Sequence, residues 1–512
     1  MRTKNDSMFP METCAAEYHI FEVDGRKFAY ETNSMAVGAI PPSGNTADFC
    51  LDLPSQKPRP LPNADLTPRH VVLGVTHACQ LRCKYCFVDE YYSEGLDVRK
   101  MEFKTAREFL SKHLKGDSVH IGFFGGEPLL NMDLIKDVVC YASDHYKRCS
   151  FGVTTNGLAL LKKHGGQTNL DYLAGKRFSG VFSIDGPQQA HDEMRVFADG
   201  SGSWEKVMAA LRATKGSGFR PTLRATFSAN IVNSGCSLKD RVQFLNELLY
   251  DGIGSHVSVE PVALTESSCV KNPDAGVTVE QVAALESQYV GATKWLAGEF
   301  NAGRKPSWHQ VVLYASRLFY RNHAMTECGA GKGYMAVNAA GDVFSCHREM
   351  NSKIGSIAAG IDEDLREKWV DNRIQNRQGC VECPIRFCCG GGCREESIGE
   401  FSGSMLPEDA IRVPVPAQCG LKMLMFKSAL LLLDEIDAEK VLKNPRKTKA
   451  NTTGKRKIVP PHLSQLKPAQ NKDLSYSEPC IEVVYMGHKT LMPLSAVAKG
   501  GSVVVRDVAV EV

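Results

Sequence analysis

The sequence predicts an α/β fold: a partial (β/α)6 barrel followed by a cysteine-rich domain, with a small β-hairpin before the barrel and a C-terminal β extension. Three observations predict it. Short apolar segments alternate with segments of helical periodicity over residues 70–262, which is the pattern of parallel strands joined by helices. Cysteines gather densely from residue 328 onward. Alternating apolar and polar residues near both ends of the chain predict strands outside the barrel.

The barrel prediction depends on six strand candidates, fewer than the eight of a closed (β/α)8 barrel. We therefore expect a partial barrel that is open on one side. The strand candidates are His70–Val75, Val119–Phe124, Ser150–Thr154, Gly180–Ile184, Thr222–Phe227 and Val257–Val262. Helical periodicity is found at Phe103–Leu114, Asp133–Tyr146, Trp204–Thr214 and Lys239–Leu249, and further on at Thr278–Gly303, Trp308–Asn322 and, in amphipathic form, Ser428–Leu442.

Both ends of the chain predict small β elements. His19–Tyr30 contains two alternating runs around Asp24-Gly25, which is a typical hairpin turn. Ile481–Val512 contains two valine-rich runs around Gly500-Gly501. The expected domains are residues 14–66 (hairpin and linker), 67–305 (barrel), 306–442 (cysteine-rich domain), 443–479 (flexible basic linker) and 480–512 (β extension).

Composition excludes several classes of function. The 512 residues are 43% hydrophobic and 23% charged, as in a soluble globular protein with a substantial core. A net charge of +3 is too small to indicate nucleic acid binding. The sequence contains no apolar run long enough for a membrane span and begins without an apolar signal core, so we expect a cytoplasmic protein. Since cytosolic thiols are kept reduced, the 18 cysteines indicate metal sites rather than disulfides.

The segment Thr76–Asp89, THACQLRCKYCFVD, places Cys79, Cys83 and Cys86 on one short loop. A [4Fe–4S] cluster usually takes four cysteines, so three leave one iron free, and Tyr85 puts an aromatic ring beside it. This spacing resembles the signature of the radical S-adenosylmethionine (SAM) enzymes. The resemblance implies that the free iron binds SAM, whose cleavage yields a 5'-deoxyadenosyl radical that abstracts hydrogen from a substrate. A zinc knuckle is the alternative, but it needs a fourth ligand, and none lies next to this loop.

The ends of the predicted strands are the next candidates, because barrel enzymes place their chemistry there. Gly125, Gly126 and Glu127 belong to a GGEP segment after the second strand. Glycines allow close approach to a ligand, and the carboxylate can receive an ammonium group. In radical SAM enzymes this segment contacts the amino group of methionine, so the resemblance assigns it to SAM. The resemblance also assigns Ser183 and Arg195 to the ribose or carboxylate of SAM.

Structural roles are the alternatives at several strand ends. Asn156 and Asp185 are residues that turns favour, and Arg195 could form a surface ion pair. Arg224 and Glu260, on the fifth and sixth strands, could line the barrel cavity or pair with each other.

Seven further cysteines form a second array around a glycine-rich turn. The gaps in its densest part, CVECPIRFCCGGGC, resemble the SPASM domain, which holds auxiliary iron–sulfur clusters in radical SAM enzymes that modify peptides and proteins. The resemblance implies two auxiliary clusters, both expected to be [4Fe–4S]. Cys380, Cys383, Cys389 and Cys419 would hold the distal cluster, and Cys328, Cys346 and Cys393 the nearer one. Two zinc ribbons are the alternative.

The nearer cluster lacks a fourth ligand in this assignment. It could have an open iron, be a smaller cluster, or be closed by Cys388 or by a ligand from outside the chain. We favour the open iron, because a substrate thiolate binds iron well.

The residues after Cys346 separate the subfamilies that the array resembles. Anaerobic sulfatase-maturating enzymes carry an aspartate base there, whereas this chain has His347 and Arg348. His347 could act as a base or as a structural hydrogen-bonding group. The N-terminal hairpin resembles a reduced leader-peptide-binding element. Together with the open cluster site and the Cys-His-Arg segment, it makes the chain resemble peptide maturases that form thioethers. The SCIFF maturases and the quinohemoprotein amine dehydrogenase maturation protein are the comparisons.

The expected function is therefore that of a radical SAM peptide or protein maturase that forms a thioether cross-link. Its expected partners are a ribosomal peptide or protein substrate and an electron donor such as flavodoxin or ferredoxin, with no nucleic acid and no membrane. The alternatives are a formylglycine-generating sulfatase maturase and a non-catalytic iron–sulfur or zinc scaffold.

Overall fold

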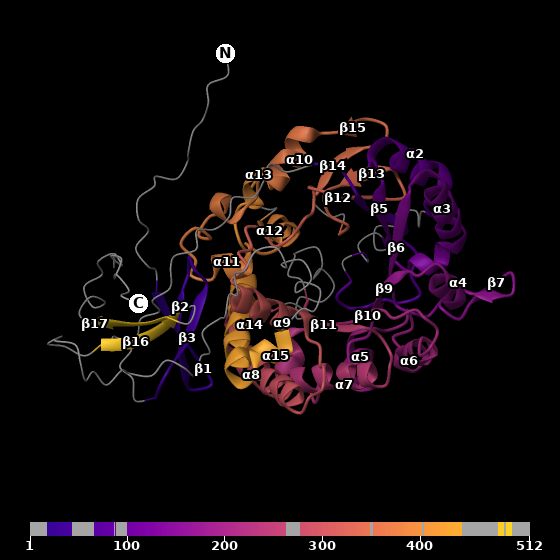
Figure 1. Cartoon of the computed structure of the whole chain (residues 1–512). Coiled ribbons are helices and arrows are strands. Elements are labelled where there is room, and N and C mark those ends of the chain that lie inside the picture. Colours follow the sequence, from indigo (N-terminus) through magenta and orange to yellow (C-terminus); the bar gives the residue numbers. More distant parts are fainter. Residues whose placement is uncertain are drawn as a thin grey trace, which may run out of the picture. The chain divides into compact units, whose positions relative to one another are not determined.

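The computed structural model describes residues 18–42, 66–86, 88, 100–262, 277–348, 352–401, 404–442, 480–485 and 488–493 (Figure 1). The chain forms two compact units. The larger, Pro60–Ala315 with Ala324–Ile436, contains the main sheet and is called the barrel unit below. The smaller, Met1–Arg59 with Ser316–His323 and Asp437–Val512, contains two small antiparallel sheets and is called the terminal unit.

The six predicted barrel strands form one parallel sheet in chain order. They are β4 (His70–Thr76), β5 (Ser118–Gly125), β6 (Arg148–Thr155), β9 (Ser179–Ser183), β10 (Thr222–Phe227) and β11 (His256–Pro261). The helices between them are α2 (Phe103–His113), α3 (Met132–His145), α4 (Asn169–Gly175), α5 (Gln188–Met194), α6 (Trp204–Ala213) and α7 (Leu238–Tyr250). These helices lie on the outer side of the curved sheet (Figure 1). The predicted partial barrel is confirmed.

The sheet continues past β4 with four strands that the sequence analysis did not predict. They are β12 (Tyr334–Val337), β13 (Asp342–Phe344), β14 (Lys353–Ser356) and β15 (Gly360–Ile361). β12 pairs with β4 in parallel, and β13 runs back along β12. The segments before Tyr334 and after Phe344 therefore meet at the end of the sheet where β4 begins.

Local signals explain where several helices begin. Thr168, Ser237 and Thr278 each close a capping box at the start of α4, α7 and α8 (Val279–Asn301). The central strands are buried on both faces, as in β4, where Val71 and Val72 point to opposite faces and both are buried. Burial on both faces is what a parallel sheet covered by helices requires.

The cysteine-rich region of the barrel unit is built from short helices and one long helix. They are α10 (Glu363–Val370), α11 (Arg386–Cys389), α12 (Arg394–Phe401), α13 (Pro407–Ala410) and α14 (Pro416–Glu435). The prediction of one amphipathic helix over Ser428–Leu442 is wrong, because α14 begins at Pro416 and a separate α15 (Ala438–Leu442) follows it. α14 packs against α8 and buries Leu430, Leu431, Leu432 and Leu433 together, so it has no polar side there. The predicted helix at Trp308–Asn322 corresponds to α9 (His309–Tyr320).

In the terminal unit, the predicted hairpin is confirmed and gains a third strand. β1 (Tyr18–Val23) and β2 (Arg26–Glu31) join through Asp24 and Gly25, whose φ angles of 51° and 70° suit a tight turn. β3 (Ala36–Ile40) pairs with β2. β16 (Cys480–Tyr485) and β17 (His488–Pro493) form the C-terminal hairpin, while the predicted turn at Gly500-Gly501 lies outside the described residues.

Within the described ranges, no helix combines the length and apolar character that crossing a membrane requires. The basic linker predicted over residues 443–479 lies outside these ranges. The domain boundaries expected from the sequence stay predictions.

Candidate functional site

The loop that follows β4 carries the first three cysteines. Cys79, Cys83 and Cys86 are all partly buried on it. The loop is tied to the segment after α5, because the N–H of Arg82 donates to the carbonyl of Val196 over 2.7 Å. The cysteine loop is therefore held between the C-terminal end of β4 and the end of α5.

The glycines of the GGEP segment pack directly on the start of this cysteine loop. A Cβ atom at Gly125 would overlap the carbonyl oxygen of Thr76, and one at Gly126 would overlap the carbonyl oxygens of His77 and Ala78. The N–H of Gly126 donates to the Thr76 carbonyl over 2.8 Å. The two glycines therefore position the loop, a role that the sequence analysis did not assign to them.

The Glu127 carboxylate is fully buried, and its hydrogen-bond donors come from the protein itself. It accepts hydrogen bonds from the N–H of Leu129 (3.1 Å), the hydroxyl of Thr155 (2.7 Å) and the N–H of Asn156 (2.7 Å). Burial raises the pKa of Glu127 to about 7, although these three donors lower it. Glu127 thus joins the GGEP segment to the end of β6. Its predicted contact with the ammonium of SAM stays a prediction.

A buried network beside Cys83 joins Tyr85, Asp185 and Arg195. The Tyr85 hydroxyl donates to Asp185, and Arg195 Nε lies 3.0 Å from the same carboxylate oxygen. The other oxygen accepts from the N–H of Thr226 over 2.9 Å. Arg195 also lies over the Tyr85 ring at 5.3 Å and places Nη1 4.0 Å from Cys83 Sγ. The ion pair of Arg195 and Asp185 is therefore buried, whereas the sequence had suggested a surface ion pair as the structural alternative for Arg195.

Asp185 is the functional residue that the sequence analysis underestimated. Its side chain is fully buried, so its role goes beyond the turn chemistry considered for it. Its position directly after β9, at a strand end, was the available signal.

Two further predicted residues lie at neighbouring strand ends. The Asn156 side-chain amide lies 3.6 Å from Cys79 Sγ. Ser183, at the end of β9, is partly buried and pairs in register with Arg224. Burial raises the pKa of Cys79 and that of Cys83 to about 12.

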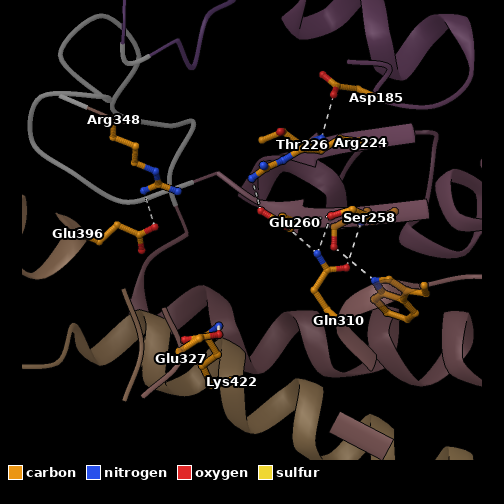
Figure 2. A network of polar contacts seen from close by, with 12 residues as sticks. Asp185, Arg224, Thr226, Ser258, Glu260, Gln310, Glu327, Arg348, Glu396 and Lys422 are labelled. Atoms are coloured by element: carbon orange, nitrogen blue, oxygen red, sulfur yellow. Dashed lines mark hydrogen bonds and ion pairs between the residues drawn. The ribbon is translucent and has the colours of Figure 1, made fainter. Parts of the chain in front are cut away.

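Figure 2 shows a second polar network, on the inner side of β10 and β11. Arg224 forms an ion pair with Glu260. The other Glu260 oxygen accepts from the Ser258 hydroxyl (2.9 Å) and the Gln310 amide (2.7 Å). Although burial raises the pKa of Glu260, Arg224 together with more distant Arg348 and Lys422 lowers it below its usual value. The pairing considered for Arg224 and Glu260 is thus present.

The structure brings together the four cysteines predicted for the distal auxiliary cluster. Cys380, Cys383 and Cys389 lie on the turns around α11, and Cys419 lies in the first turns of α14. Burial, followed by the neighbouring Cys389, Cys380 and Cys383, raises the pKa of Cys419 to about 12. These four thiols therefore lie near one another.

The three cysteines predicted for the nearer cluster surround Arg394. The buried guanidinium of Arg394 donates to the carbonyl of Ala330 (3.0 Å) and the carbonyl of Cys328 (3.3 Å). Burial lowers the pKa of Arg394, while Cys328, Cys393 and Cys346 act in the opposite direction. Arg394 therefore anchors the loop of Cys328 to the helix that follows Cys393.

His347 is partly buried, and its ring is held by hydrogen bonding and aromatic contact. Its Nδ1 forms a hydrogen bond with the Tyr334 hydroxyl, and its ring meets Phe124 edge-on at 4.7 Å. Burial, followed by the charge of Arg348, lowers the pKa of His347 to about 3. Arg348 itself donates to Glu396 over 2.7 Å (Figure 2). This geometry favours the structural role considered for His347, and the catalytic role stays a prediction.

A cavity of about 590 Å³ occupies the lumen of the barrel sheet. Phe124 and Thr154 line it near the C-terminal ends of β5 and β6, where the GGEP segment begins. Cys328 and Cys346 line it as well, from the segments that flank the start of β12. The cavity therefore reaches from the strand ends next to the GGEP segment to two cysteines of the second array.

The donor sets fit clusters rather than single ions. Across the part of the chain that the structure describes, no three His, Cys, Asp or Glu side chains converge as one metal ion would need. A [4Fe–4S] cluster is wider than one ion, so its cysteines stand further apart. Three thiols on one loop and four around α11 and α14 are the donors such clusters use.

Comparisons with known proteins agree with this geometry. Residues 73–245 match the model of the Radical SAM superfamily. The uncharacterized protein MJ0907 of Methanocaldococcus jannaschii is 30% identical over 191 residues, which span 36% of this chain and 60% of that protein. The radical SAM cyclopropyl synthase TigE of Paramaledivibacter caminithermalis is 22% identical over 346 residues, 63% of this chain and 67% of TigE.

Among solved structures, native anSMEcpe with bound AdoMet and Cp18Cys peptide shares the fold, with a TM-score of 0.55 and 16% identity over 72% of this chain and 98% of that chain. Residues 73–245 of this chain are therefore identified as a radical SAM domain.

Proposed function

We propose that this protein is a radical SAM peptide or protein maturase whose substrate residue enters the barrel lumen between the two cysteine groups. The observation that carries the proposal is the cavity that reaches from Phe124 and Thr154 to Cys328 and Cys346. A residue bound there would lie beside the strand ends that precede the GGEP segment and beside two cysteines of the second array. The similar fold of anSMEcpe, solved with both AdoMet and a peptide, supports a peptide substrate.

Cys79, Cys83 and Cys86 would hold a [4Fe–4S] cluster, and SAM bound with it would supply the group that abstracts hydrogen from the substrate. The chain's own residues keep that loop in place. Gly125 and Gly126 pack on the start of the loop. Glu127, the next residue, joins this segment to the end of β6 through the Thr155 hydroxyl.

The remaining residues proposed for SAM lie around Cys83. Asp185 fixes the ring of Tyr85 and the guanidinium of Arg195, so both face the cysteine loop in one arrangement. Ser183 stands at the neighbouring strand end. We assign Tyr85, Ser183 and Arg195, with Gly125, Gly126 and Glu127, to SAM binding.

The product that we favour is a thioether. Forming it removes one C–H and one S–H bond, makes one C–S bond, and releases two electrons in total. One electron leaves with the abstracted hydrogen atom. The other would pass to an auxiliary cluster, held by Cys380, Cys383, Cys389 and Cys419 or by Cys328, Cys346 and Cys393, and from there to a protein such as ferredoxin or flavodoxin.

The test is anaerobic reconstitution followed by measurement of iron content and 5'-deoxyadenosine. We expect Cys83→Ala to abolish 5'-deoxyadenosine formation, and Cys383→Ala to retain part of it while losing product. Cys140→Ala is the matched control, because Cys140 is exposed and outside both arrays. Equal SAM cleavage by the wild type and Cys83→Ala would overturn the proposal. A reconstituted wild type that forms no 5'-deoxyadenosine would favour the non-catalytic scaffold.

The formylglycine alternative is separated by the mass of the product. A cysteine-bearing peptide serves as the substrate in this test. Cross-linking removes two hydrogens and keeps the sulfur, whereas conversion of cysteine to formylglycine also removes the sulfur. At the position where sulfatase maturases were expected to carry an aspartate, this chain has His347, whose Nδ1 is already hydrogen-bonded to the Tyr334 hydroxyl.

A further inference from the structure

The strand register arranges the inward side chains of the barrel in layers. Tyr334, His70, His120 and Ser150 lie side by side on β12, β4, β5 and β6 and form the layer nearest the start of the sheet. The next layer consists of Ala336, Val72, Gly122, Gly152 and Ser179. Inward layers of such barrels are usually filled with bulky branched side chains. Here the second layer contains small residues, with two glycines at its centre.

Gly122 and Gly152 are direct partners on neighbouring strands, and both face the cavity. A Cβ atom at Gly122 would lie 3.1 Å from Cγ2 of Val72. One at Gly152 would lie 3.0 Å from Nε2 of His120 and 3.1 Å from the Ser179 hydroxyl. Side chains from the neighbouring strands therefore lie close beside the glycines, and an added carbon would press against them.

The walls above and below this glycine pair are aromatic. The His70 ring meets the rings of His120 and Tyr334 edge-on at 4.6 and 4.8 Å. Phe124 lines the opposite part of the cavity. Burial followed by the charge of His120 lowers the pKa of His70 to about 4, and burial lowers that of His120, so both rings are neutral near pH 7. Among the described residues that line the cavity, none is Asp, Glu, Lys or Arg.

We propose that Gly122 and Gly152 form the floor of a pocket that selects an uncharged aromatic side chain of the peptide substrate. A flat ring can lie on two adjacent glycines and meet the surrounding rings edge-on, which is the arrangement that aromatic pairs prefer. A charged side chain would find no counter-ion among the lining residues and would lose its hydration. This inference rests on the proposed function, because it names the substrate class of the same lumen.

The experiment measures binding of side-chain analogues to the full-length, anaerobically reconstituted protein by saturation-transfer NMR. The probes are p-cresol and toluene for aromatic side chains, and propionate and n-butylammonium for charged ones. We expect p-cresol and toluene to bind and the charged probes to give no signal. Gly122→Val places three carbons in the pocket, so p-cresol should bind at least about tenfold more weakly, a change of about 1.4 kcal/mol.

Gly298→Val is the matched control, because Gly298 lies exposed on α8 with no atom within 4 Å of its Cβ position. If Gly122→Val does not fold by circular dichroism, Gly152→Ala takes its place, since that methyl group meets only movable ends of His120 and Ser179. Two results would overturn the inference. One is binding of the charged probes as strong as that of p-cresol, and the other is a folded pocket variant that binds p-cresol as tightly as the control does.

The two proposals fail separately. A protein that cleaves SAM and gives no p-cresol signal would refute the aromatic pocket and leave the maturase proposal in place. A protein that binds p-cresol through Gly122 and does not cleave SAM would refute the maturase proposal alone.

Discussion

Replacing Asp185 by Asn tests whether the buried carboxylate organises the cysteine loop. Asn keeps the size of the side chain and an oxygen that can accept from the N–H of Thr226, now at 2.9 Å. It removes the negative charge that faces Arg195, which is 8% exposed beside a carboxylate that is fully buried. Although burial alone would lower the pKa of Arg195, Asp185 and Tyr85 hold it above its usual value. Removing one partner of such a buried pair costs about 3–5 kcal/mol, because the other charge stays buried without compensation.

Equilibrium urea unfolding of the anaerobically purified protein measures this cost. We expect Asp185→Asn to lower the free energy of unfolding by about 3 kcal/mol or more. Adding Arg195→Gln should recover at least about 1 kcal/mol, because the two residues are coupled. Glu108→Gln is the control, since its pair with Lys112 is exposed and its loss should leave the unfolding midpoint unchanged. A loss below about 1 kcal/mol, or a double variant no more stable than Asp185→Asn, would refute the reasoning.

Two further predictions concern the support of the loop and the lumen. Gly125→Ala should lower the melting temperature more than the control Gly216→Ala does. Both glycines have positive φ angles, of 137° and 73°, but only at Gly125 would the methyl group overlap a backbone oxygen. The pKa of His70 falls from 6.5 in the unfolded chain to about 4 in the fold, so stability should be lost as the pH drops through this interval. His70→Phe should flatten this part of the pH–stability curve, and an unchanged curve would contradict the assignment.

The barrel strands could be predicted because their signal is local. Each is a short apolar run bounded by turn residues, and the alternation with helices fixes a parallel sheet. β12 gave no such signal: its four residues, YMAV, follow a glycine-rich segment and pair with a strand far away in the sequence. The start of α14 was missed for a related reason. Pro416 is well suited to a first helical turn, but the Cys419-Gly420 step reads locally as a break.

The sequence could group candidate residues on one loop and at neighbouring strand ends, but it could not identify the partners of their side chains. Motif spacing identified Cys79, Cys83 and Cys86, because metal ligands on one loop are a local pattern. The partners of polar residues are not local. Glu127 was expected to face a ligand, yet its three donors come from two different strand ends. Asp185 meets Tyr85 from a distant part of the sequence, which only the closed arrangement of the strands brings about.

The pairing of β12 with β4 explains how one substrate residue can lie between both cysteine groups. The cysteine loop follows the C-terminal end of β4, whereas Cys328 and Cys346 flank the hairpin of β12 and β13 at the end where β4 begins. β4 has seven residues, which span about 20 Å at the usual rise of a strand. The separation of the two groups is thus set by a buried strand rather than by flexible segments. The small residues of the second inward layer keep the path between them open, so the same sheet that holds the two groups apart also provides the space in which a substrate side chain can lie between them.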